Sequence, residues 1–137
     1  MRAKLGVLLL GTWIATVAQA AGPKIREVQV QFPKGATSAS LKGKLKGDET
    51  VDYVLRAAAG QSMVVVFKPG NPSAYFNVLP PGSDAAIFIG STSGGRYEGT
   101  LPTDGTYTIR VYLMRSAARR NESTTYALDV GVSGIVK

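Results

Sequence analysis

Residues 106–113 read Thr106-Tyr107-Thr108-Ile109-Arg110-Val111-Tyr112-Leu113. Large apolar side chains fall at the odd-numbered positions of this stretch, and more polar ones fall at the even-numbered positions. Because successive side chains of a strand point to opposite faces, this alternation predicts a β-strand with one face in a core. A segment that starts at Thr124 has the same period, with Tyr126, Leu128 and Val130 on one face. Together they predict two long strands joined by one connection.

Working outward, the same pattern extends over most of the chain. Apolar alternation or short apolar runs predict strands in these segments: 25–32, 38–45, 51–55, 63–67, 75–79, 85–89, 96–101, 106–114 and 124–132. The run 63–67 is continuously apolar, which is typical of a central strand that is buried on both faces. Gly, Pro and Asp separate the segments at regular intervals. About eight short strands with this spacing predict an all-β fold, a single antiparallel β-sandwich of jelly-roll-like form.

The N-terminal segment has the features of a secretory signal. Arg2 and Lys4 precede an apolar stretch over residues 5–17, and Ala18-Gln19-Ala20 is a small-x-small cleavage site. We expect residues 1–20 to be a signal peptide that is cleaved near Ala20, and residues 21–137 to form one exported, soluble, periplasmic domain. The apolar stretch is short for a membrane span, and the alternative is a retained N-terminal anchor.

Composition excludes several classes of function. The chain has 16 Lys and Arg against 9 Asp and Glu, and loss of Arg2 and Lys4 with the signal leaves 14 basic residues and a net charge of +5. It has no His and no Cys, so it lacks the usual zinc ligands and the commonest general base. No phosphate-binding loop or nucleophile elbow is present, and the spacing of the scattered carboxylates does not indicate a glycosidase-type pair. We therefore expect no enzyme, with no catalytic residue, metal or cofactor, and a partner other than nucleic acid.

The connection between the two long strands is rich in arginine. Residues 115–122 read Arg-Ser-Ala-Ala-Arg-Arg-Asn-Glu, and guanidinium groups offer planar forks of donors that fit carboxylates or phosphates. The connection is too long for a two-residue hairpin, so it predicts a protruding loop or a single helical turn. In a helical turn Arg115 and Arg119 lie at i and i+4 on one side, whereas Arg120 and Glu122 lie off that side, where Glu122 can form a local salt bridge. The alternative is a solvated turn whose charges discourage edge-to-edge aggregation.

Two other loops carry polar side chains. Residues 93–97 read Ser-Gly-Gly-Arg-Tyr, a turn that leads into a strand. One interpretation is a projecting loop that offers Ser93 and Tyr97 as neutral donors beside Arg96. The other is an ordinary hairpin tip with Tyr97 packed on the sheet. Residues 42–49 mix three lysines with Asp48 and Glu49, and are most simply a solvated turn.

The order of several motifs resembles the periplasmic inhibitors of goose-type (g-type) lysozyme over essentially all of residues 21–137. The most specific element is Arg-x-x-Ala-Arg-x-Asn at residues 115–121, in front of the last strand. The other matching segments are Gly60-Gln61-Ser62-Met63, Tyr75-Phe76-Asn77-Val78-Leu79, Gly95-Arg96-Tyr97, Leu101-Pro102, Gly105-Thr106-Tyr107 and Tyr126-Ala127-Leu128-Asp129-Val130. These pieces also recur in secreted β-sandwich modules of the bacterial pre-peptidase C-terminal type, so they bear on fold more than on function.

The resemblance implies a β-sandwich that places loops in the substrate cleft of a lysozyme, where a catalytic Glu lies. Arg115, Arg119 and Asn121 match the family motif that enters this cleft, and Arg120 adjoins them. The resemblance also implies one difference, because the turn after Lys46-Gly47 can carry a contacting Tyr in g-type inhibitors and here holds Asp48.

Ser93, Gly94 and Tyr97 match a second pattern, Ser-Gly-x-x-Tyr, which resembles the inhibitory loop of invertebrate-type and chicken-type lysozyme inhibitors. Those two lysozyme classes therefore stay open as partners beside the favoured g-type. The expected function is non-enzymatic inhibition of a lysozyme that attacks bacterial peptidoglycan. The alternative is a secreted β-sandwich module that binds glycan or another envelope component. Sheet edges also leave homodimerisation open.

Overall fold

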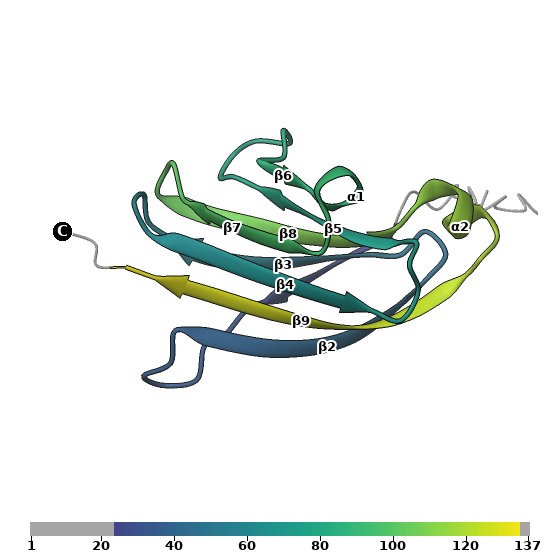
Figure 1. The fold of residues 1–137 in the computed structure, drawn as a ribbon, viewed down its shortest axis with the longest axis horizontal. Coiled ribbons are helices and arrows are strands. Elements are labelled where there is room, and N and C mark those ends of the chain that lie inside the picture. The colour runs from purple at the N-terminus through teal and green to yellow at the C-terminus, as the bar shows by residue number, and fades with distance from the viewer. Residues whose placement is uncertain (1–23, 135–137) are drawn as a thin grey trace, which may run out of the picture.

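The computed structural model describes residues 24–134, and the predicted signal peptide at residues 1–20 lies outside them. No helix within residues 24–134 has the length and apolar character needed to cross a membrane. The described chain consists of strands and two short helices (Figure 1): β1 Ile25–Gln29, β2 Ser38–Lys46, β3 Thr50–Ala57, β4 Ser62–Pro69, β5 Ala74–Leu79, β6 Phe88–Ile89, α1 Gly90–Ser93, β7 Arg96–Thr100, β8 Gly105–Leu113, α2 Arg115–Arg119 and β9 Ser123–Ser133.

The strands form two sheets that pack face to face as a sandwich, so the predicted all-β architecture is confirmed. The first sheet has the order β1-β3-β8-β5-β6, and the second has the order β2-β9-β4-β7. Neighbouring strands are antiparallel except β1 and β3, which pair in parallel from Ile25 with Thr50 to Gln29 with Val54. The parallel pair arises because the chain leaves the first sheet after β1, forms β2 in the second, and returns as β3 in the direction of β1.

The core lies between the sheets and follows the alternation in the sequence. In β8, the side chains of Tyr107, Ile109 and Val111 are fully buried. The opposite face of β8 carries Arg110, whose Nε and Nη2 donate to the two carboxylate oxygens of Asp52 at 2.8 and 2.9 Å. This bidentate pair raises the pKa of Arg110, mainly through the hydrogen bonds to Asp52. The Arg110 guanidinium, at a polar position of the strand, thus has its hydrogen-bond partner on the outer face of the first sheet.

Two of the predicted strands differ in detail. Only Phe88–Ile89 of the segment 85–89 pairs in a sheet, with Asn77 and Val78 of β5 as partners. The run 63–67 is an inner strand, but Val64 and Val66 are only half-buried, because no other layer covers the outer face of the second sheet within residues 24–134. The apolar run 63–67 therefore predicted an inner strand correctly, but the prediction that both of its faces are buried is wrong.

Three connections between the two sheets meet at one end of the sandwich. The turn between β2 and β3, the turn between β4 and β5, and α2 between β8 and β9 each join a strand of one sheet to a strand of the other. Figure 1 shows α2 at this end, together with the first part of β9. We call it the α2 end. The crossing of the chain between sheets therefore brings the arginine-rich connection next to two turns that are distant in sequence.

Candidate partner-binding surface

The arginine-rich connection forms a single helical turn, which is one of the two forms that the sequence predicts. Helix α2 spans Arg115–Arg119, and the Ala118 N–H donates to the Met114 carbonyl oxygen at 2.9 Å. Ala117 is fully buried, whereas Arg115 and Arg119 are exposed. The small alanine side chain packs the helical turn against the end of the core. The i, i+4 spacing then places the two guanidinium groups on one side of the turn.

The end of α2 is fixed by a defined backbone motif. The Asn121 N–H donates to the Ala118 carbonyl oxygen at 3.0 Å, and the Glu122 N–H donates to the Ala117 carbonyl oxygen at 3.1 Å. These two bonds form a Schellman motif, which requires a residue in the left-handed conformation after the helix. Asn121 has φ 57°, and within residues 24–134 no other residue except glycine has a positive φ. Asn121 therefore serves to end the helix.

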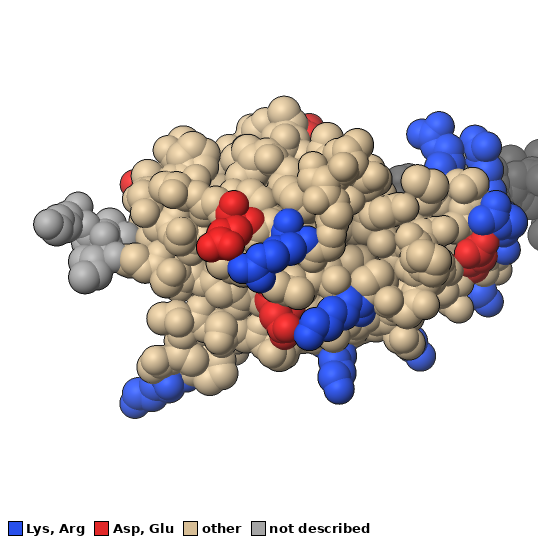
Figure 2. All heavy atoms as spheres, viewed as in Figure 1, with Lys and Arg blue, Asp and Glu red and all other residues tan. Residues whose placement is uncertain are grey.

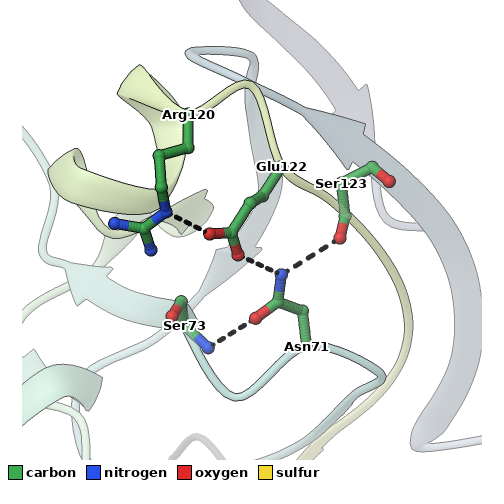
Figure 3. A network of polar contacts seen from close by, with 5 residues as sticks. All are labelled: Asn71, Ser73, Arg120, Glu122 and Ser123. Carbon is green, nitrogen blue, oxygen red and sulfur yellow. Dashed lines mark hydrogen bonds and ion pairs between the residues drawn. The ribbon is translucent and has the colours of Figure 1, made fainter.

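Glu122 ties this connection to the turn between β4 and β5 (Figure 3). Arg120 Nε donates to Glu122 Oε2 at 2.6 Å, and Asn71 Nδ2 donates to Glu122 Oε1 at 3.0 Å. Asn71 Nδ2 also donates to the Ser123 carbonyl oxygen at 3.2 Å, and Asn71 Oδ1 accepts the Ser73 N–H at 2.9 Å. The hydrogen bond from Asn71, and then that from Arg120, lower the pKa of Glu122. The predicted local salt bridge of Glu122 is therefore present, with Arg120 as its partner.

The turn between β2 and β3 supports α2 from a second direction. The Gly47 N–H donates to the Glu122 carbonyl oxygen at 2.8 Å. Gly47 has φ +63°, and a Cβ atom on it would lie 2.7 Å from Asn121 Oδ1. A side chain at position 47 would therefore displace Asn121 and suffer an unfavourable backbone conformation. A turn that the sequence presented as merely solvated thus packs directly on the candidate site.

The charge at this surface is predominantly positive. Within residues 24–134, neither Arg115 nor Arg119 forms an ion pair, while Arg120 is held by Glu122. Figure 2 shows Lys and Arg side chains gathered at the α2 end, with little acidic surface among them. Two exposed guanidinium groups on a short, anchored helix can bind carboxylates that enter from solvent. In the described part of the chain, no three His, Cys, Asp or Glu side chains group as a metal site.

The loop at residues 93–97 borders the turn between β4 and β5. Ser93 ends helix α1, and Gly94 follows with φ 99° and donates its N–H to the Gly90 carbonyl oxygen at 2.9 Å. A small pocket of about 180 Å³ is lined by Gly94 and Gly95 on one side and by Pro69 and Pro72 on the other. The loop thus borders the turn that also contacts the arginine-rich connection through Asn71, although within residues 24–134 no hydrogen bond or ion pair joins the two groups of candidate residues directly.

Two residues of that second loop have partners within the sheet. Arg96 Nη2 pairs with Glu98 Oε2 at 3.0 Å on the exposed surface of β7. The Tyr97 ring is half-buried and lies with its centroid 5.3 Å from that of Phe88. Burial, and then the neighbouring Tyr107, raise the pKa of Tyr97. Tyr97 thus packs on the sheet, as the simpler of the two sequence interpretations describes, while Ser93 and Gly94 remain exposed.

Sequence reasoning missed three residues that build the α2 surface: Gly47, Asn71 and Ala117. Asn71 lies in Pro69-Gly70-Asn71-Pro72, where the proline and glycine indicated only a turn. Nothing in the sequence connects that turn with Glu122. Ala117 carried a usable signal, since a small apolar residue between two arginines of a helical turn faces the opposite side from them.

Comparisons with known proteins place these features in context. No protein-family model matches the chain. An inhibitor of g-type lysozyme from Escherichia coli (strain K12) is 32% identical over 131 residues, which cover 92% of each chain. The crystal structure of Aeromonas hydrophila PliG, a periplasmic inhibitor of g-type lysozyme, is 44% identical with a TM-score of 0.75, over 80% of this chain and 98% of that one.

A third similarity concerns the fold alone. The pre-peptidase C-terminal domain of collagenase from Bacillus anthracis is 18% identical, with a TM-score of 0.56 over 80% of this chain and 97% of that domain. The sandwich is therefore shared with proteins of other functions, and only the residues on its loops can distinguish them.

Proposed function

Because this chain belongs to the family of periplasmic inhibitors of g-type lysozyme, we propose that it acts in the periplasm as a protein inhibitor of a g-type lysozyme. It is not an enzyme in this role. It occupies the substrate cleft of the lysozyme and so protects bacterial peptidoglycan from hydrolysis. The proposal rests on family membership for the target, and on the α2 surface for the mechanism.

The observation that carries the mechanism is the pair of free guanidinium groups on α2. Arg115 and Arg119 are exposed, lie one helical turn apart, and have no carboxylate partner within residues 24–134. A lysozyme cleft presents carboxylates to its substrate, so two guanidinium groups can form charge-assisted hydrogen bonds there. When the partner covers them, water is excluded and each such bond strengthens.

The neighbouring candidates take supporting roles in this proposal. Asn121 ends the helix, and its exposed amide lies at the same surface. Arg120 holds Glu122 and thereby fixes the connection to the turn at Asn71. At the loop of residues 93–97, the exposed Ser93 and Gly94 remain candidates for a second contact. Arg96 and Tyr97 instead maintain β7 through their partners within the domain.

A turbidity assay tests the proposal. Purified protein is added to g-type, chicken-type and invertebrate-type lysozymes acting on bacterial cell walls. The expected result is stoichiometric inhibition of the g-type enzyme and weaker or no inhibition of the other two. Inhibition of none of the three, together with retention of the protein on peptidoglycan, would contradict the proposal and indicate a glycan-binding module.

A further inference from the structure

A basic groove lies directly beside the α2 surface. Its volume is about 770 Å³, and it is open to solvent along one side. The end of β2, the start of β9, the turn between β4 and β5, and one residue of β1 form its walls. The cations that line it are Arg26, Lys44 and Lys46, and one carboxylate, that of Glu49, lies among them.

The positive charges of this groove are not neutralised within the domain. Neither Arg26, Lys44 nor Lys46 forms an ion pair within residues 24–134. Glu49 Oε1 accepts the backbone N–H of Lys46 at 3.0 Å, so part of its charge is already engaged. Lys44 and Lys46 alternate along β2 and therefore project on the same side of the strand. The groove is thus a concave surface with surplus positive charge.

The wall opposite the lysines is held rigidly. Asn71 donates its backbone N–H to Thr124 Oγ1 at 3.1 Å, and Thr124 Oγ1 donates to the Thr125 carbonyl oxygen at 2.8 Å. Asn71 also binds Glu122, as described above. The same residue therefore lines the groove and anchors the connection that carries Arg115 and Arg119. The groove and the α2 surface are parts of one continuous face of the molecule.

The area that a stable complex needs extends beyond α2. A specific protein interface involves roughly 20–30 residues on each side, whereas residues 115–122 supply only eight. The segments that contact this connection are the turn at Gly47 and the turn at Asn71. The first continues directly into the Lys46–Glu49 part of the groove, and the second forms its opposite wall. An interface of this size that is centred on α2 can therefore extend over the groove.

We infer that this groove takes an acidic surface segment of the lysozyme, at the rim of the cleft that α2 enters. The inference rests on the proposed function. Charge complementarity favours a carboxylate-bearing segment, since Lys44, Lys46 and Arg26 outnumber Glu49. Among residues 24–134, no aromatic side chain lines the groove, so this part of the chain gives it no stacking surface of the kind that proteins commonly offer to sugar rings. A polypeptide segment fits it better than a glycan does.

The test uses Lys44→Thr/Lys46→Thr and a control with the same loss of charge, Lys34→Thr/Arg56→Thr. Lys34 lies in the loop between β1 and β2, and Arg56 lies near the end of β3, both at the opposite end from α2 (Figure 1). All four side chains are exposed, and threonine preserves strand propensity. Association with g-type lysozyme is measured by biolayer interferometry at several salt concentrations, beside inhibition and thermal melting.

We expect the groove variant to associate about tenfold more slowly than the wild type at low salt and to lose much of the salt dependence, because charges at the rim of an interface act mainly on the association rate. The control variant retains most of the wild-type rate. Equal association rates for the groove variant and the control variant would overturn the inference. The proposed function would not be affected as long as the wild type inhibits the lysozyme. Loss of retention on peptidoglycan with unchanged lysozyme binding would assign the groove to an anionic glycan and also overturn it. A wild type that inhibits no lysozyme refutes the proposed function, and the inference with it.

Discussion

Arg119 is the residue at which charge reversal has the sharpest expected effect. Its guanidinium is exposed at the last position of α2 and forms no ion pair within residues 24–134. We expect Arg119→Glu to weaken inhibition of g-type lysozyme at least about 100-fold, since an arginine paired with a buried carboxylate contributes roughly 3 kcal/mol or more to binding. Arg115→Glu has a similar effect. Titration of lysozyme activity against inhibitor concentration measures both.

The matched control for these variants is Arg56→Glu, which makes the same charge change far from α2. It is expected to inhibit as the wild type does, and all three proteins are expected to melt together because the altered side chains are exposed. If Arg119→Glu inhibited as well as Arg56→Glu does, α2 would not be the inhibitory element.

Substitutions of Asn121 distinguish its role in the backbone from a contact with the lysozyme. At φ 57°, glycine is at least as favourable as asparagine, whereas alanine costs about 1 kcal/mol. We expect Asn121→Gly to keep the melting temperature and most of the inhibition, and Asn121→Ala to lower the melting temperature. A glycine variant that is fully stable but does not inhibit would show that the amide itself contacts the lysozyme.

At the scale of elements, the turn between β2 and β3 is expected to control the position of α2. Gly47→Ala places a Cβ atom 2.7 Å from Asn121 Oδ1, whereas Gly35, at φ +80°, has open space around the same position. Both substitutions carry the strain of a positive φ, about 1 kcal/mol. Only Gly47→Ala should also reduce inhibition, and comparison of inhibition constants at equal fractions folded checks this. Equal inhibition by the two variants would mean that the turn does not position α2.

The Glu122 network predicts a dependence of stability on pH. The folded state lowers the pKa of Glu122 below its ordinary value of 4.5. Its contribution to stability is therefore present above pH 4.5 and is lost as the pH falls through the lower, folded pKa. We expect the difference in melting temperature between the wild type and Glu122→Gln to shrink between pH 5 and about pH 3. A difference that stays constant over this range would exclude the ionised carboxylate as its source.

The sequence predicted the elements better than the contacts between them. Alternation placed β8 and β9 and their buried faces, because one core side is enough to impose a period of two. The length of the connection predicted a protruding loop or a single helical turn, and the spacing of Arg115 and Arg119 predicted that a helical turn would carry both on one side. The support of that turn by Gly47 and Asn71 depends on the connections β2–β3 and β4–β5, which pass from one sheet to the other. No local sequence pattern specifies that these connections will meet the turn. In the same way, the sequence did not predict that the Tyr97 ring would pack against Phe88, which lies in the other sheet.

At the scale of the whole molecule, the position of α2 depends on how the two sheets pack. Helix α2 leaves β8 in the first sheet and leads into β9 in the second. The sheets are joined inside the core by the hydroxyl groups of Tyr53 in β3 and Tyr126 in β9, which lie 2.7 Å apart. Both side chains are buried, and burial, followed by the hydrogen bond with Tyr53, raises the pKa of Tyr126. This bond therefore links the two sheets, and the Tyr126 hydroxyl stays protonated at physiological pH.

A double-mutant cycle on this pair tests whether the bond holds the sheets together. Tyr53→Phe or Tyr126→Phe alone leaves one buried hydroxyl without its partner, at an expected cost of about 1–2 kcal/mol in the free energy of unfolding. The double variant removes both hydroxyl groups and should cost less than the sum of the two, with a coupling of about 1 kcal/mol. Urea denaturation measures the four proteins. Additive costs would show that the hydroxyl groups do not act as a pair. If the bond also sets the position of α2, each single variant should inhibit lysozyme less well than the wild type. The double variant, in which neither hydroxyl group is left without a partner, should then recover part of that inhibition.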